Sequence, residues 1–530
     1  MKMLKISNIK YKIVKDEKIT YDMLIDFLYK FISKKYKVKN LSNVELTKKS
    51  LDARTSDLVY NLSCVFSCSN EESLLKNTNL TKYSTPKELI ELKNLRVKRR
   101  FKILVVGMGP SGLFNAFVLN KAGFDVTLIE KGDCVEERIK KVNNFFENGI
   151  LDESSNIQFG EGGAGTFSDG KLGTNVDSPY IKFIFEKLVE FGANKDILYE
   201  AKPHVGTDVL RKVIINLRNH LIESGVKVMF NTELVDFDSN SASLLYNKEK
   251  KLVEHFDYLV LAVGHSATPI YELLKKKEVL LEPKNFAVGV RIEHLQSEIN
   301  KVQYHKEYHN LGAADYKLVA HVKDRSLYSF CMCPGGYVVN ASSEQGCMVT
   351  NGMSNNSRDS LNANSALLVN VNVDDYYTGD VLDGLKFLKK YESLAYNKYG
   401  KFIAPIQLVG DFIKGIPSTK IGSVIPSIKP SYQLGTIDDV LPPFVVETLK
   451  EGLPLLDKKI HGFACDDAVM TAIETRSSAP IRIKRNSDLE TSIPNVYAIG
   501  EGSGYAGGIT TSAIDGIKIA IQIVKKVEEN

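Results

Sequence analysis

The chain has 530 residues, of which 43% are hydrophobic and 25% are charged, and it carries seven cysteines. This composition is typical of globular proteins, and it excludes a disordered chain, a collagen and a small disulfide-rich domain. The length predicts two or three domains.

The sequence has no stretch of about 18 uncharged apolar residues, so we expect no membrane span. Lysines interrupt every apolar run within the first twenty residues, which argues against a signal peptide. An odd number of cysteines without a secretory pattern favours a cytoplasmic protein with reduced thiols.

The net charge of +5 is unevenly distributed along the chain. Residues 1–100 contain 22 Lys and Arg against 11 Asp and Glu, whereas the other 430 residues contain 47 against 53. The basic part ends in RVKRR at 96–100, a cluster that can meet nucleic acid or another acidic partner. A solvated lysine-rich surface explains the same excess, and we expect a small-molecule substrate rather than a nucleic acid.

Residues 1–75 have the pattern of a small α+β domain. A strand is predicted near residues 4–14, and apolar residues at helical spacing predict a helix over 21–36. Two strand-like runs follow, the second at 58–66 with alternating faces. Residues 76–100 are polar and charged, and we interpret them as a linker.

From residue 101 the pattern becomes that of a nucleotide-binding domain. The continuous apolar run ILVV at 103–106 predicts a strand that is buried on both faces. It leads into GMGPSG at 107–112 and a helical stretch, and a second apolar run at 126–129 ends in Glu130.

Each part of this fingerprint has a mechanical reason. Gly107 permits a tight turn, Gly109 lets the backbone approach a pyrophosphate, and Gly112 allows the helix to pack closely on the strand. The amino end of the helix offers unpaired N–H groups and a partial positive charge to phosphates. Glu130 can accept hydrogen bonds from ribose hydroxyls, so the nucleotide is expected to lack a 2′-phosphate.

Three further segments favour FAD over NAD. The run at 258–264 ends in a glycine and resembles the Ala-x-Gly element of the FAD domain in glutathione-reductase-type flavoproteins. NVYAIGE at 495–501 resembles the final strand of that domain, with Glu501 where an aspartate normally holds the ribityl chain. The segment 504–512 opens a last helix, whose amino end would stabilise the reduced flavin.

A loop with six glycines, GEGGAGTFSDGKLG at 160–173, is expected to bring its backbone against the cofactor. The residues expected to bind FAD are Gly107, Gly109, Pro110, Ser111, Gly112, Glu130, Lys131, Arg138, Gly162, Gly163, Gly165, Gly264, Gly500, Glu501, Gly508, Ile509 and Thr510.

Several longer strings extend this likeness over nearly the whole chain, namely QFGEGGAGTFSDGKL, FAVGVRIEH, FCMCPGG, NGMSNNSRDSLNANSA, ETRSSAP and EGSGYAGGITTSAIDG. They resemble the family of uncharacterised FAD-dependent dehydrogenases, and KSLDAR at 49–54 is similar to that family's N-terminal domain. Leu295 stands where the family pattern has proline, and Ser477 where it has threonine. The resemblance implies the fold and the cofactor FAD, and it supplies no substrate.

Residues 285–455 do not follow the nucleotide-binding pattern. Strand-like runs dominate at first, and a helical pattern follows near 381–397. We expect a β-rich α+β substrate or cap domain, inserted into an FAD-binding domain that comprises residues 101–284 and 456–530. The predicted fold class is therefore α/β, a Rossmann-like FAD-binding domain with this insertion and the small N-terminal α+β domain.

Two groups of side chains are candidates for proton or electron transfer. Cys331 and Cys333 can be read as a redox pair facing the flavin, or as buried cysteines that pack as small apolar groups, and a CxC ring would be strained. His265 and His294 are candidate acid–base groups.

Other polar residues are candidates for binding. Four arginines within the family strings can orient an anionic substrate: Arg291, Arg325, Arg358 and Arg476. His305 and His309 can flank a metal, but a solvated pair explains them more simply, and we expect no metal. The residues expected to act in catalysis are Arg291, His294, Cys333, Arg476 and His265.

The sequence thus predicts an FAD-dependent oxidoreductase that moves a hydride between the flavin N5 and a small substrate. Because a second nucleotide fingerprint is absent from the sequence, NAD(P)H is expected at most as a transient donor. Two alternatives stay open: an RNA-modifying flavoenzyme that uses the basic N-terminal domain, and a non-enzymatic flavin-binding sensor.

Overall fold

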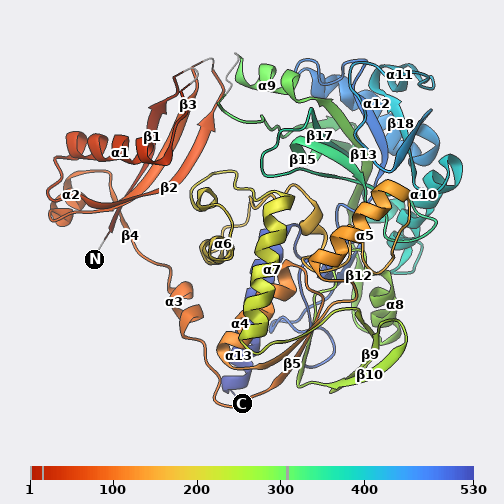
Figure 1. The fold of residues 1–530 in the computed structure, drawn as a ribbon, viewed down its shortest axis with the longest axis horizontal. Coiled ribbons are helices and arrows are strands. Elements are labelled where there is room, and N and C mark those ends of the chain that lie inside the picture. Colours follow the sequence, from red (N-terminus) through yellow and green to blue (C-terminus); the bar gives the residue numbers. More distant parts are fainter. Residues whose placement is uncertain (1–2, 15–16, 56, 306–309, 530) are drawn as a thin grey trace.

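The computed structural model describes residues 3–14, 17–55, 57–305 and 310–529. Figure 1 shows an N-terminal unit at the left in red, a domain around β5 at the bottom, and a β-rich domain at the upper right. Among the described helices, none combines the length and the apolar content that crossing a bilayer requires.

The N-terminal unit is one antiparallel sheet with the strand order β2-β3-β1-β4, covered by a helix. The helix α1 (Tyr21–Tyr36) buries Leu24, Leu28 and Ile32 in the core of this unit. The predicted strand, helix and two strands are all present. The other elements of the unit are β1 (Met3–Lys12), β2 (Ser42–Asp52), β3 (Val59–Ser67), α2 (Glu71–Asn77) and β4 (Thr81–Tyr83).

Residues 76–100 are more ordered than the linker that the sequence suggested. The unit ends later than residue 75, because β4 pairs with β1. The helix α3 (Lys87–Asn94) then packs Leu89 and Leu92 into the core of the following domain. Because this segment is mostly polar and charged, its sequence indicated neither the pairing of β4 nor the packing of α3.

The second domain is built on a five-stranded parallel sheet in the order β22-β11-β5-β6-β7, which confirms the Rossmann-like fold. Ile103 and Val105 of β5 face one side of this sheet, whereas Leu104 and Val106 face the other. The strands are β5 (Lys102–Val106), β6 (Asp125–Ile129), β7 (Lys227–Met229), β11 (Tyr258–Leu261) and β22 (Val496–Ala498).

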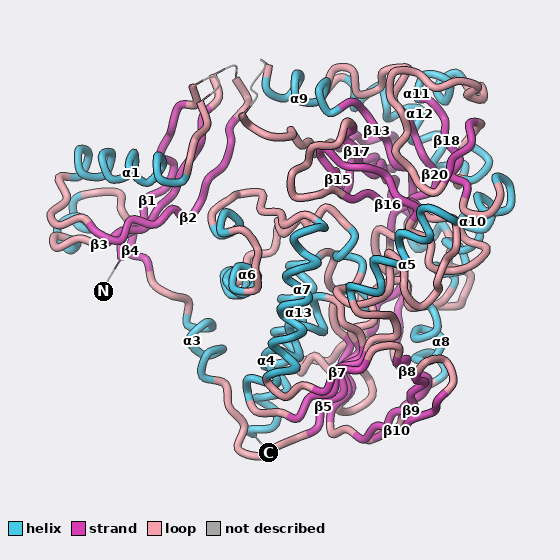
Figure 2. Tube along the Cα trace, viewed as in Figure 1, coloured by secondary structure: helices cyan, strands magenta, loops and turns pink. Residues whose placement is uncertain are grey.

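Both faces of this sheet are covered, as its continuous apolar strands require. One face carries helices α4 (Pro110–Ala122), α6 (Tyr180–Glu190), α7 (Thr207–Glu223) and α13 (Ile509–Glu529). The other face carries β8 (Thr232–Phe237), β9 (Ser241–Tyr246), β10 (Lys250–His255) and α8 (Thr268–Lys276). Figure 2 shows α4, α7 and α13 side by side.

The cap domain contains an eight-stranded sheet, seven strands of which run in the order β14-β15-β17-β13-β20-β18-β19. Its strands are β13 (Phe286–Leu295), β14 (Val319–Val322), β15 (Arg325–Asn340), β16 (Thr350–Met353), β17 (Asn362–Val371), β18 (Ile403–Leu408), β19 (Ser431–Leu434) and β20 (Val469–Glu474). Its helices include α9 (Gln296–Tyr304), α10 (Asp383–Tyr399), α11 (Val409–Lys414) and α12 (Pro443–Asp457). The boundary expected at residue 455 is wrong, because β20 pairs with β13 and β18 inside this sheet.

The chain enters and leaves the cap domain through two strands that pair with each other. β12 (Leu281–Pro283) leads into the cap, and β21 (Ile481–Ile483) leads out of it. They form an antiparallel pair, so the two connections are tied together.

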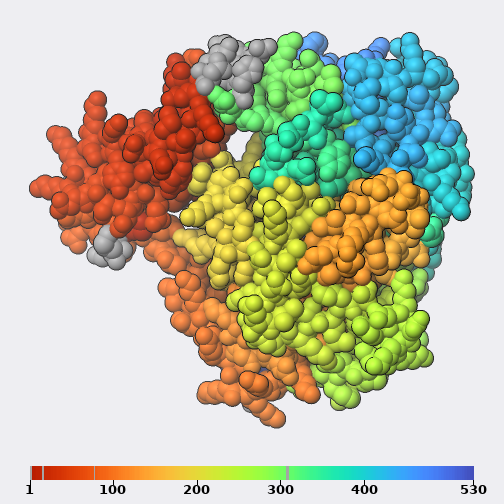
Figure 3. Space-filling view, viewed as in Figure 1, coloured from red at the N-terminus to blue at the C-terminus, as the bar shows by residue number. Residues whose placement is uncertain are grey.

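The N-terminal unit touches the rest of the chain at several places, among them β2 and the core of the cap domain. Lys49 of β2 forms a parallel bridge with Glu200, and Ile13 and Leu58 are buried in the core of the cap domain. Figure 3 shows the unit projecting from one side of the molecule.

Candidate functional site

A cavity of about 370 Å³ lies at the carboxyl ends of the parallel strands. One wall is made by the turns that follow β5, β6, β11 and β22, and by the start of α13. The other wall belongs to the cap domain and includes Cys331, Asn351, Glu474 and Arg476. Since β6 and β11 flank β5 on opposite sides, this is a switch point of the sheet, where α/β proteins bind ligands.

The glycine turn after β5 has no room for side chains where it faces the protein, but it has room where it faces the cavity. A Cβ on Gly107 would lie 2.4 Å from the Ala262 carbonyl oxygen, and one on Gly112 would lie 2.0 Å from the Gly107 carbonyl oxygen. Gly109 lines the cavity and caps α4, and a Cβ there would meet nothing within 4 Å. The turn therefore fits a pyrophosphate, which the helix amino end would bind.

Glu130 is buried at the end of β6 and organises three backbone segments. Its Oε2 accepts from the Met108 N–H at 3.0 Å, and its Oε1 accepts from the N–H groups of Gly132 and Gly160 at 2.9 and 3.2 Å. The carboxylate also lines the cavity, next to Lys131. Burial lowers the pKa of Lys131, whose Nζ lies 3.2 Å from the centroid of the Phe159 ring.

The second glycine loop is held from behind by Arg138 of α5 (Val135–Asn148). This fully buried side chain donates hydrogen bonds to the carbonyls of Asn156, Ile157, Gly160, Glu161 and Gly163, at 2.6 to 3.2 Å. Arg138 does not line the cavity, so it shapes the loop.

His265, which follows β11, and Glu501, which follows β22, are neighbours in the cavity lining. His265 Nδ1 lies 3.2 Å from Glu501 Oε2. The other ring nitrogen, Nε2, is buried without a hydrogen-bond partner among the described residues. The pair can hold a proton at this place.

Most of the predicted cofactor residues line the cavity: Gly107, Gly109, Pro110, Ser111, Glu130, Lys131, Gly163, Gly165, Gly264, Glu501, Gly508 and Ile509. The others support it from behind. Gly500 donates its N–H to Asp515 at 2.7 Å, and Thr510 donates its hydroxyl to the Leu172 carbonyl at 2.7 Å. A Cβ on Gly162 would collide with Thr166, and Gly112 and Arg138 act as described above.

Arg291 does not line the cavity and is saturated with partners. Its guanidinium pairs with Glu474 at 3.1 Å and donates to Cys331 O at 2.8 Å and to Asn351 Oδ1 at 2.9 Å. Those three partners do line the cavity. Arg291 thus positions the cap wall instead of contacting a ligand.

The other three candidate arginines differ in their distance from the cavity and in their carboxylate partners. Arg325 pairs with Asp375, away from the cavity, and Arg358 pairs with Asp169 at 2.6 Å. Arg476 lines the cavity, and its Nε and Nη2 donate to Glu392 of α10 at 2.8 and 2.7 Å.

Two of the predicted histidines lie elsewhere. His294 is buried on β13, with Nε2 2.7 Å from the Phe463 carbonyl oxygen, and burial lowers its pKa to about 4. It does not line the cavity. His305 follows α9 and contacts the Ala53 carbonyl, and His309 lies outside the described residues.

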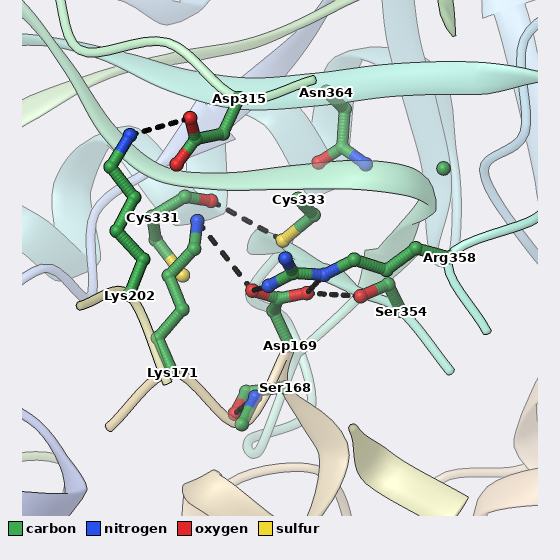
Figure 4. A network of polar contacts seen from close by, with 12 residues as sticks. Ser168, Asp169, Lys171, Lys202, Asp315, Cys331, Cys333, Ser354, Arg358 and Asn364 are labelled. Carbon is green, nitrogen blue, oxygen red and sulfur yellow. Dashed lines mark hydrogen bonds and ion pairs between the residues drawn. The ribbon is translucent and has the colours of Figure 1, made fainter. Parts of the chain in front are cut away.

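Cys331 lines the cavity, whereas Cys333 is buried behind it. The Cys333 thiol donates to the Cys331 carbonyl at 3.3 Å. Both belong to β15, and Figure 4 shows them beside Asp169 and Lys171.

Sequence reasoning missed several polar residues that line the cavity, namely Asp169, Lys171, Asn351 and Glu474. Lys171 pairs with Asp169 at 3.5 Å, and Arg358 and Ser354 also contact that carboxylate (Figure 4). All four stand within the strings quoted above, but no spacing rule singles them out.

Comparison with known proteins agrees with this geometry. Residues 285–477 match the family described as "FAD-dependent protein, C-terminal domain-like". An uncharacterised protein of Clostridium beijerinckii is 42% identical over 524 residues, covering 96% of this chain and 98% of that protein. The matched segment contains the cap wall of the cavity, and the glycine turn forms the opposite wall. FAD is therefore the cofactor of this chain.

The solved structures that resemble this chain are more distant. One is CtdE in complex with FAD, at 11% identity and a TM-score of 0.31, covering 81% of this chain and 88% of that one. Another is a flavoprotein/dehydrogenase from Cytophaga hutchinsonii, at 12% identity and a TM-score of 0.33, covering 81% and 79%.

Proposed function

The chain belongs to the same family as its Clostridium beijerinckii relative and is an FAD-dependent oxidoreductase, and we propose that it moves a hydride between the flavin and a small substrate held against the cap domain. Bound FAD supplies the hydride chemistry at its N5 atom. NAD(P)H is proposed as a transient donor or acceptor in the same cavity.

One observation carries the proposal: a single cavity is lined by both the glycine turn and the cap domain. Gly109 and Glu130 stand at one end, and Cys331 and Arg476 stand on the cap wall. A substrate that enters between the domains would therefore lie against the cofactor.

The His265–Glu501 pair supports proton transfer in this cavity. The Glu501 carboxylate orients the ring through Nδ1, which leaves Nε2 as the atom that gives or takes a proton. The Nε2 atom is available for this role because it has no hydrogen-bond partner among the described residues.

Two cations on the cavity wall favour an anionic or strongly polar substrate. Glu392 occupies one edge of the Arg476 guanidinium, and Nη1 has no hydrogen-bond partner among the described residues. Lys171 is about one-third exposed and lines the same cavity. Together they can orient a carboxylate or phosphate group.

The position of the basic segment favours a small molecule over RNA as substrate. Residues 96–100 lead into the amino end of β5, whereas the cavity lies at its carboxyl end, beyond Val106. A strand of five residues spans about 17 Å, so a nucleic acid on that segment would lie well away from the cavity.

An anaerobic titration of the purified holoprotein with NADH and then NADPH tests the proposal. We expect the flavin absorbance to bleach with one of them, or with a small polar hydride donor. Persistent oxidised absorbance with every such donor, while dithionite bleaches it, would overturn hydride transfer as the function.

A variant tests the role of His265 in the same assay. His265→Gln is expected to slow flavin reduction at least about 100-fold, because general acid–base catalysis contributes that much, and to keep its FAD content. The matched control His461→Gln changes a histidine whose side chain is 97% exposed, and it should react like the wild type. An unchanged rate in His265→Gln would remove His265 from the mechanism.

A further inference from the structure

Cys331 stands on the cap wall of the cavity in an unusual backbone conformation. Its φ angle is +43°, in the left-handed region that residues other than glycine seldom adopt. The pairing between β15 and β17 shifts register between Phe330 and Cys333, so the strand bulges at this residue. Bulges commonly re-aim a side chain beside a functional site.

The bulge brings two thiols together that a regular strand would keep apart. Residues at i and i+2 of a strand are separated by roughly 6.6 Å, whereas a disulfide needs Cβ atoms about 4 Å apart. Here the Cys333 thiol turns back toward Cys331 and donates to its carbonyl oxygen at 3.3 Å. All seven cysteines of the chain are present as free thiols.

The surroundings of the pair favour a thiolate at Cys331. The neighbouring Cys333 thiol and the positive charge of Arg291 lower the pKa of Cys331. Lys171 adds to this effect, whereas burial and Asp169 oppose it. The same interaction with Cys331, together with burial, raises the pKa of Cys333. The Cys331 thiol therefore ionises more readily than the Cys333 thiol, and thiol–disulfide exchange requires one thiolate.

The other cysteines do not share this environment. Burial raises the pKa of Cys64 to about 12 and that of Cys347 to about 11, and it also raises the pKa of Cys68, Cys134 and Cys465. None of these five lines the cavity.

We propose that Cys331 and Cys333 are a redox-active pair that exchanges two electrons with FAD in the shared cavity. In the oxidising direction the two S–H bonds break and one Sγ–Sγ bond forms. The electron pair and the two protons pass to oxidised FAD, which becomes FADH2. The strain of so small a ring favours easy reduction of the disulfide, as in catalytic disulfides rather than structural ones.

This inference rests on the FAD site and adds a second electron carrier to the proposed function. Its test is the number of electrons that the holoprotein accepts. The protein is oxidised with diamide, freed of reagent and titrated anaerobically with dithionite. We expect wild type to accept two electron pairs per chain, and Cys331→Ser and Cys333→Ser to accept one. Cys347→Ser is the matched control and should accept two.

A second measurement needs no variant. Wild-type samples, before and after dithionite, are alkylated with iodoacetamide, digested and weighed by mass spectrometry. The oxidised sample should contain the Cys331–Cys333 peptide unalkylated and lighter by two hydrogen atoms, and the reduced sample should contain it doubly alkylated. Double alkylation in both samples, or uptake of one electron pair by wild type, would overturn the redox pair.

The outcomes separate this inference from hydride transfer. A protein that is bleached by a hydride donor but accepts one electron pair keeps the proposed function and loses the thiol pair. A protein that accepts two pairs but reacts with no hydride donor keeps the thiol pair and loses the proposed function.

Discussion

Buried arginines in this chain hold backbone in place, and their surroundings decide which of them can meet a ligand. Arg138 binds the carbonyls of one glycine loop, and Arg291 binds the cap wall. Both are fully buried and use their donors internally. Arg476 lines the cavity, and its Nη1 has no hydrogen-bond partner among the described residues. The residue type is the same in all three cases, so the distinction depends on partners elsewhere in the sequence.

Two glycines of the fingerprint turn should respond differently to the same substitution. In Gly109→Ala the added Cβ meets no protein atom, so we expect an unchanged melting temperature of the apoprotein. The Cβ enters space that faces the cofactor, and FAD affinity should fall about tenfold or more, equivalent to about 1.4 kcal/mol. Fluorescence titration of the apoprotein with FAD measures this.

Gly112→Ala is the matched comparison. Its Cβ would lie 2.0 Å from the Gly107 carbonyl oxygen, so the turn itself must shift, and both stability and FAD binding should fall. Equal FAD affinity in wild type and Gly109→Ala would mean that the cofactor does not approach this turn.

At the scale of elements, local patterns predicted much more than long-range pairing did. The strand, glycine turn and helix of residues 102–122 follow from apolar runs and glycine spacing, which act within a few residues. By contrast β20 was assigned to the wrong domain, because a short apolar strand carries no mark of its partners. Asp169 and Glu474 were missed for the same reason, since their partners Arg358 and Arg291 lie 189 and 183 residues away in the sequence.

The buried histidine of β13 should make the protein less stable in acid. His294 has a pKa of about 4 in the folded protein, below the ordinary value of 6.5, so unfolding takes up a proton between these values. The free energy of unfolding therefore falls as the pH drops from 6.5 toward 4. From pH 7 to pH 5 this one group should cost about 2 kcal/mol.

Urea unfolding of wild type and His294→Gln at both pH values measures this contribution. The glutamine amide can still donate to the Phe463 carbonyl, and it does not titrate. The variant should lose about 2 kcal/mol less than wild type on acidification, while His461→Gln should lose as much as wild type. His204, whose pKa burial also lowers to about 4, is unchanged in all three proteins and cancels in the comparison. Equal losses in wild type and His294→Gln would contradict the assignment.

At the scale of the whole molecule, the cofactor cavity joins two domains that are also connected by two neighbouring chain segments. The cap leaves and rejoins the nucleotide-binding domain through β12 and β21, which pair with each other. The cap wall and the glycine turn line the same cavity. Bound FAD should therefore stabilise both domains together, and heating should unfold them in one transition.

Thermal melts at increasing FAD concentration test this coupling. At free FAD a hundred times its dissociation constant, binding should add about 2.7 kcal/mol to the free energy of unfolding. ADP, which lacks the flavin, should bind the glycine turn without reaching the cap wall, and at equal concentration it should raise the melting temperature less. Gly109→Ala should need more FAD for the same shift. Two separate transitions, of which FAD moves only one, would mean that FAD does not couple the stability of the two domains.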